Sequence, residues 1–278
     1  MKRSMSVMLL CATLAGPAVA GDGKLIGTAG LNQLEGSGGG GIVPWATLSG
    51  YDSDEQTSLN VFTTLVNVDD YRLQVLGASA SLYDRVELSV ARQTFDLTTL
   101  GGDISQTVWG AKVRLYGDVV YSRFPQISAG MQYKDLQDDA IATAFGSADS
   151  NSIDYYLAAT KVHLGAAGGY NLVWNLTARM TNANQMGLLG AGRAGDDGYD
   201  LMLEGSVGVL FNRHFAVGAE YRQKPDNLGL GEDDWWDVFV TYIPSKSFNV
   251  TVAWAELGSI AGAAGQNGLY VSVGGQLW

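Results

Sequence analysis

The sequence has little cysteine, histidine or proline and no long apolar run. Its single cysteine, Cys11, lies in the first twenty residues, so disulfide bonds play no part in the predicted mature chain. No later segment approaches about 18 consecutive apolar residues, which excludes membrane-spanning helices. The two histidines, His163 and His214, do not fall in a metal-ligand or nucleophile pattern. These absences predict a protein that is not an enzyme and has no catalytic residue, metal or cofactor.

Basic charge is also scarce, because 17 Lys and Arg face 28 Asp and Glu, giving a formal net charge of −11. Loss of Lys2 and Arg3 with a leader peptide would take the charge to −13. An acidic chain repels nucleic acid, so no nucleic-acid partner is expected. Glycine is abundant, at 37 of 278 residues, against a usual share of about 7%. With five prolines, this composition favours a large β-structure with many turns over disorder.

The N-terminus has the pattern of a signal peptide. Lys2 and Arg3 precede a short apolar core, and small residues end at Ala20. We predict cleavage after Ala20, which gives a signal peptide over residues 1–20 and one barrel domain over residues 21–278. Cys11 follows Leu10 within the apolar core, so it does not fit a lipid-attachment site.

Alternating apolar and polar residues then recur to the C-terminus, most clearly at Trp236–Tyr242, Phe248–Trp254 and Leu269–Leu277. This period of two predicts β-strands with one apolar face. Short and long connections alternate between them, as periplasmic turns and extracellular loops do in outer-membrane barrels. The sequence therefore predicts an all-β, up-and-down antiparallel transmembrane barrel of about fourteen strands. Twelve is the alternative, if the weakly patterned residues before Tyr51 form a plug or an extension.

Two polar segments are candidate plugs of such a barrel. Gly36–Gly41 satisfies a nucleotide-binding glycine pattern literally, but Pro44 follows where a helix should begin. We interpret it instead as a flexible loop or a close crossing of backbones. The second is the long loop Lys134–Asn151, which could hold a short helix around Ile141–Phe145.

Aromatic residues near strand ends predict two girdles at the membrane surfaces, namely Trp45, Tyr71, Tyr116, Tyr133, Tyr170, Tyr199, Tyr221, Tyr242 and Trp254. The last strand should carry the assembly signal for the barrel-assembly machinery, with Val271, Val273, Leu277 and Trp278. Gln276 stands where an aromatic residue is usual, so a bulge near the end of this strand is one explanation.

Charged residues on the opposite strand faces predict a charged lumen: Lys112, Arg114, Lys161, Arg179, Glu87, Glu204 and Glu220. One interpretation is a transverse field that selects small solutes. The other, slightly favoured, is a set of salt bridges that braces a filled interior. Acidic loop residues such as Asp138, Asp139 and Asp233 are more consistent with solvated carboxylates than with divalent-cation sites.

Five segments resemble a Gram-negative outer-membrane family known as domain of unknown function 3034: Gly36–Trp45, Ser81–Phe95, Gln126–Lys134, Glu232–Asp237 and Glu256–Ala261. The resemblance implies a barrel in the bacterial outer membrane and supplies no activity. We therefore expect contact with outer-membrane lipid and lipopolysaccharide. The predicted function is a passive channel or porin-like protein for small solutes. A closed structural or surface-interaction barrel is the alternative, and an outer-membrane hydrolase is a weaker third.

Overall fold

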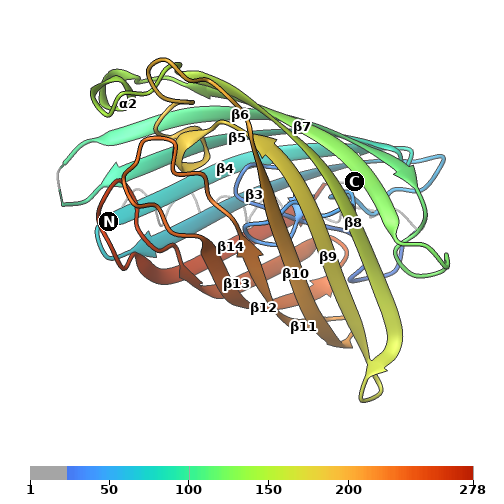
Figure 1. Cartoon of the computed structure of the whole chain (residues 1–278). Helices are drawn as coiled ribbons and strands as arrows, with labels where there is room; N and C mark the ends of the chain where they lie inside the picture. Colours follow the sequence, from blue (N-terminus) through green and yellow to red (C-terminus); the bar gives the residue numbers. More distant parts are fainter. Residues whose placement is uncertain (1–23, 100, 278) are drawn as a thin grey trace.

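Twelve antiparallel strands close into a barrel in the computed structural model, which describes residues 24–99 and 101–277 (Figure 1). Each strand pairs with its neighbours in sequence, and β14 closes the barrel against β3, where Val271 pairs with Leu65. The strands are β3 Thr57–Val68, β4 Tyr71–Leu82, β5 Val86–Leu97, β6 Asp103–Tyr116, β7 Gln126–Leu136, β8 Asn151–Ala167, β9 Tyr170–Thr181, β10 Asp200–Asn212, β11 Phe215–Arg222, β12 Trp235–Ser245, β13 Phe248–Glu256 and β14 Asn267–Gln276.

The prediction of fourteen strands is wrong and the alternative of twelve is confirmed. Residues 30–51, here called the plug, lie inside the barrel, where all but Leu31 and Trp45 are buried. Figure 1 shows this segment in blue within the ring of strands. The plug contains only the two-residue strands β1 (Leu31–Asn32) and β2 (Gly38–Gly39), which pair with each other. Its polar and glycine-rich sequence offers no continuous apolar face for lipid, so it fills the lumen instead.

The two ends of the barrel differ in their connections. Residues 83–85, 168–169, 213–214 and 246–247 make tight turns at the end where β3 begins and β14 finishes, here called the turn end. Longer segments, including 137–150, 182–199, 223–234 and 257–266, emerge at the opposite or loop end. In bacterial barrels the short turns are periplasmic and the long loops extracellular. Residues 117–125 are the one long connection at the turn end within the described chain.

The outer surface of the barrel is apolar, as contact with lipid requires. Large apolar side chains of the strands are half exposed there, such as Leu88, Leu157 and Leu176. This surface and the closed strand order identify a bacterial outer-membrane barrel. Within the described residues, no helix has the length and apolar character needed to span a membrane.

Seven of the nine predicted girdle residues are exposed near strand ends: Tyr116, Tyr133, Tyr170, Tyr199, Tyr221, Tyr242 and Trp254. The other two were wrongly placed. Trp45 belongs to the plug, and Tyr71 is buried on the lumen side of β4. The alternation of a sequence does not by itself say which face is lumenal, and at both positions the aromatic ring packs inward.

The loop Lys134–Asn151 does not plug the barrel. Lys134 and the residues up to Leu136 continue β7, and the rest forms a mostly exposed loop at the loop end with the short helix α2, Ala140–Ala144. In the last strand, Val271 and Val273 alternate with inward residues, and Leu277 donates its backbone N–H to Leu59. The predicted signal peptide and Trp278 lie outside the described residues.

Candidate functional site

The plug contacts the barrel wall through charged side chains that converge on Glu35. This carboxylate is fully buried and forms ion pairs with Lys134 (2.6 Å), Arg222 (2.8 Å) and Arg179 (3.3 Å). Two wall acids complete the network, because Arg179 also pairs with Asp154 at 2.9 Å and Glu204 at 2.5 Å. Three acids thus face three bases in a buried cluster, which avoids the cost of an uncompensated buried charge.

A second contact is made by Glu87 on β5. Its carboxylate accepts hydrogen bonds from the backbone N–H groups of Gly38 (2.8 Å) and Ser49 (2.7 Å). Lys112, on the adjacent β6, pairs with Glu87 at 3.2 Å and donates to the carbonyl oxygens of Gly38 and Thr47. The wall therefore satisfies plug backbone groups that a strand partner would otherwise satisfy.

A third contact is made by Glu220 on β11. It accepts hydrogen bonds from the N–H groups of Gly41 (2.5 Å) and Ile42 (2.8 Å), from the Ser206 hydroxyl and from the Trp45 indole. Asp237 lies opposite Glu220 in the register of β11 and β12 and is 1% exposed. Neither Asp237 carboxyl oxygen has a hydrogen-bond partner among the described residues. Two acids thus share this part of the lumen, and no described base forms an ion pair with either.

Close approach explains the glycines of the plug. A Cβ atom on Gly40 would lie 2.0 Å from the Glu220 carboxylate, and one on Gly38 would lie 2.7 Å from the Glu87 carboxylate. Neither contact is sterically possible, so a side chain would displace the acceptor. The segment Gly36–Gly41 is therefore a close backbone crossing, which was one of its two interpretations from sequence.

The predicted lumen charges divide into two groups. Lys112, Arg179, Glu87, Glu204 and Glu220 are buried in the lumen and all bind the plug or each other. The other two, Arg114 and Lys161, lie at the turn end.

Arg114 pairs with Asp84 and Asp118 at the turn end. The prediction that Lys161 faces the lumen is wrong. It alternates with Thr160, which faces the plug, and donates to backbone carbonyls of residues 118, 120 and 122.

The connection 117–125 is organised around Asp118. Partial burial alone would raise the pKa of this carboxyl, but the N–H groups of Tyr121 and Val120 and the charges of Arg114 and Lys161 together lower it. The two N–H groups donate at 2.7 and 2.8 Å. Asp118 is therefore held ionised at the turn end.

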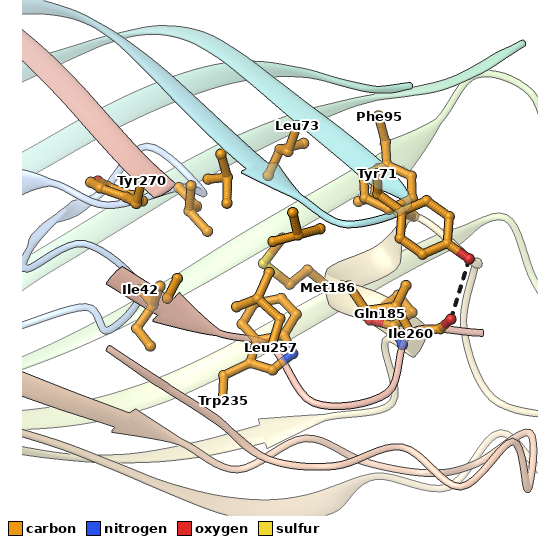
Figure 2. A pocket seen from close by; sticks show the side chains of 15 residues that line it. Ile42, Tyr71, Leu73, Phe95, Gln185, Met186, Trp235, Leu257, Ile260 and Tyr270 are labelled. Carbon is orange, nitrogen blue, oxygen red and sulfur yellow. Dashed lines mark hydrogen bonds between the residues drawn. The ribbon is translucent and has the colours of Figure 1, made fainter. Parts of the chain in front are cut away.

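Above the plug, toward the loop end, the lumen becomes apolar. Its floor is Leu34 and Ile42 of the plug, and its wall comes from β3–β5 and β12–β14 with the start of the loop after β13. Its roof is the segment Gln185–Leu188 with Ile260. We call this space the apolar chamber; it encloses about 30 Å³. Figure 2 shows Tyr270 and Ile42 on one side of it and Tyr71, Phe95 and Ile260 on the other.

Sequence reasoning missed Glu35, Lys134, Asp154 and the apolar chamber. Glu35 lies among the weakly patterned residues before Tyr51, and the sequence predicts a loop from Lys134 onward. The strand containing Asp154 has no clear apolar phase in the sequence. In the structure three consecutive residues of this strand, Thr160, Lys161 and Val162, are all buried. Ion pairs across the lumen join residues that are far apart in the chain, so no short sequence pattern indicates them.

Neither histidine forms a hydrogen bond with a serine or an acid among the described residues. His163 accepts a hydrogen bond from the Trp174 indole on the exposed side of the wall, and His214 contacts the Ile243 carbonyl oxygen in its turn. Across residues 24–99 and 101–277, no three His, Cys, Asp or Glu side chains are grouped so as to hold a metal ion.

The chain matches one family profile and is similar to several solved structures. The family profile for "Protein of unknown function (DUF3034)" matches residues 28–274. No curated protein matches the chain. Among solved structures, the chain is similar to the KdgM porin, with 13% identity, a TM-score of 0.49, and coverage of 78% of this chain and 98% of the porin.

Two further solved structures are similar to the chain, with comparable identity and TM-score. The NanC porin has 11% identity and a TM-score of 0.48, covering 78% of this chain and 97% of its own. The outer-membrane protein Omp33 of Acinetobacter baumannii has 8% identity and a TM-score of 0.47, covering 81% of this chain and 99% of its own.

Proposed function

The chain belongs to the DUF3034 family, and we propose that it is a porin-like passive channel for small solutes whose plug closes the lumen at rest. The observation that carries this proposal is the nature of the contacts that hold residues 36–49. Plug N–H groups donate to Glu87 and Glu220, and Lys112 donates to a plug carbonyl oxygen. Water can replace such bonds when the plug moves, so each contributes only about 1.5–3 kcal/mol net, the range for a hydrogen bond to a charged group.

The turn end supports a route for solutes past the plug. Cavities of about 450 Å³ and 270 Å³ lie on the two sides of residues 24–28. Both are lined by polar and charged residues together with apolar ones, among them Arg114, Asp118 and Asn171. We interpret them as vestibules that end at the plug, so that passage requires the plug to move.

A closed structural barrel is the second candidate function. The ion pairs of Glu35 favour it, because breaking a buried pair by removing one partner costs about 3–5 kcal/mol. In that case the plug is a permanent core of the barrel, and the exposed loops carry out the protein's function. The two functions differ in one measurable property, which is whether the plug must move for ions to cross.

A reversible lock on the plug tests the proposal. The predicted mature chain has no cysteine, and the hydroxyl oxygens of Ser49 in the plug and Ser79 in the wall are 2.8 Å apart. The double variant Ser49→Cys/Ser79→Cys should therefore form a disulfide that fixes the plug. In a planar bilayer we expect conductance steps from the wild type, none from the oxidised variant, and their return on reduction.

The matched control links two wall strands and leaves the plug untouched. Thr64 and Ser272 face each other on β3 and β14, with hydroxyl oxygens 2.8 Å apart. Thr64→Cys/Ser272→Cys should conduct in both redox states. A folded wild type that never conducts, together with a silent reduced lock variant, would establish the closed barrel instead. If conductance appears, neutralising Lys112 should shift its ion selectivity, measured as a reversal potential under a salt gradient.

A further inference from the structure

The loop-end half of the lumen is lined by apolar side chains, which a water-filled channel does not need. The inward faces of outer-membrane barrels are normally polar. Here Val66, Leu73, Trp235 and Tyr270 point inward and are at least nine-tenths buried. Apolar plug residues, Leu34 and Ile42, face them from below.

The roof of the apolar chamber is held in a conformation that costs energy. Five non-glycine residues in the described chain have positive φ, and three of them, Gln185 (47°), Met186 (59°) and Ala261 (52°), belong to the roof or adjoin it. Such residues are disfavoured and cluster at ligand clamps and mobile segments. Met186 reaches from this roof toward Leu257 and Trp235 in Figure 2. An unbranched methionine is well suited to fill a space and to leave it.

One ion pair fastens the two roof segments to each other. Glu232, in the 223–234 loop, accepts hydrogen bonds from the Gln185 side chain and from the Ala261 N–H at 2.9 Å. Lys224 pairs with Glu232 at 2.6 Å and donates to the carbonyl oxygen of Ser259. Burial lowers the pKa of Lys224, although Glu232 opposes that effect. The roof therefore opens when this clasp is lost together with two hydrogen bonds from the wall, one from the Tyr71 hydroxyl to the Ile260 carbonyl oxygen (3.4 Å) and one from the Gln106 amide to the Met186 carbonyl oxygen (3.1 Å).

The chamber also contains an unused hydrogen-bond donor. Trp235 is 3% exposed and lines the chamber, and its indole N–H has no acceptor in the described part of the chain. A buried donor without a partner is unusual and calls for an acceptor. The aromatic rings of Tyr71, Phe95, Trp235 and Tyr270 surround the same space.

We propose that the apolar chamber is a binding site for a small, uncharged aromatic molecule with one hydrogen-bond acceptor, which enters from the loop end when Met186 and the roof move aside. This names the solute class of the proposed channel and rests on that function only for onward passage. The ligand's acceptor takes the Trp235 N–H, and its ring replaces the Met186 side chain. The closed chamber of about 30 Å³ holds little more than a water-sized sphere, so binding and roof opening are coupled.

The probe for the test is 4-fluoroacetophenone, followed by fluorine NMR on the refolded mature protein in lipid nanodiscs. We expect a saturable bound signal from the wild type. Ala255→Leu fills the chamber from its wall and should weaken binding more than tenfold. Ala111→Leu makes the same change on the other face of the wall, where Ala111 is not buried, and should leave binding unchanged. Equal signals from all three proteins would mean partition into lipid only and would overturn the proposal.

Two further variants test the parts of the site. Met186→Ala should tighten binding several-fold, because the ligand no longer displaces a side chain. Trp235→Phe should remove the preference for 4-fluoroacetophenone over fluorobenzene, which lacks an acceptor; an unchanged preference would exclude the indole as the donor. Binding by a barrel that never conducts would refute the channel and keep the site. Conductance without saturable binding would support the channel and refute the binding site.

Discussion

At the scale of single residues, Glu35 is the acid around which the lumen charges balance. It is fully buried between Lys134, Arg179 and Arg222, so its removal leaves an excess of buried positive charge. We expect Glu35→Gln to lower the free energy of unfolding by about 3–5 kcal/mol. Urea unfolding of the refolded barrel, followed by tryptophan fluorescence, measures this. Glu55→Gln makes the same change at an exposed position and should have an effect near zero.

Asp237, unlike Glu35, forms no ion pair with a described base. Its carboxyl group is buried beside Glu220 with no described hydrogen-bond partner, so it gains nothing from its environment that an amide would lose. We expect Asp237→Asn to be neutral or to raise the free energy of unfolding by on the order of 1 kcal/mol, because it relieves like-charge repulsion. Glu220→Gln, at the neighbouring position, should destabilise, since that residue holds the plug backbone. A marked loss of stability in Asp237→Asn would show that the acid has a partner, such as a bound cation.

At the scale of elements, the plug depends on a backbone that fits beneath wall carboxylates. Gly40→Ala would bring a Cβ atom to 2.0 Å from Glu220 and must displace it. If the plug moves as proposed, we expect Gly40→Ala to increase the frequency of conductance openings. Gly275→Ala is the control, because its Cβ would meet only one atom, at 3.8 Å. Equal opening frequencies in the two variants would show that this contact does not hold the plug.

The connection 117–125 has a pH dependence set by Asp118. Its pKa is lowered on folding, so its contribution to stability is present above the unfolded value of about 3.9 and is lost as pH falls through the folded value. The side chain is 36% exposed, so the contribution should stay below about 1 kcal/mol. We expect Asp118→Asn to be less stable than wild type at pH 7 and equal to it near pH 2, measured by urea unfolding at both values. A difference that persists in acid would point to packing rather than charge.

At the scale of the whole molecule, lipid solvates the outer surface. Leu176 is 63% exposed in the middle of β9. A charge at that depth should cost about 2–4 kcal/mol, so Leu176→Arg should reduce the folding free energy into lipid vesicles by that amount. Leu25, which is 60% exposed at the turn end, is the control, and Leu25→Arg should change folding little. Equal costs at both positions would contradict the placement of the bilayer around the middle of the strands.

The sequence by itself determined the barrel, because period-two alternation and paired turns are local properties of each strand. It also placed Glu87, Lys112, Arg179, Glu204 and Glu220 on inward faces, since their neighbours in the same strands are apolar. It left twelve and fourteen strands open, because a glycine-rich segment without an apolar face fits either a weak strand or a plug.

Only the tertiary structure decided what the lumen contains. The partners of Glu35 lie 99, 144 and 187 residues away in the chain, at Lys134, Arg179 and Arg222. The chamber wall joins β3–β5 to β12–β14. Such contacts arise when the barrel closes and the plug occupies its interior, and strand periodicity carries no information about either event. For the same physical reason, Trp45 and Tyr71 have the sequence pattern of girdle residues but pack inside the lumen.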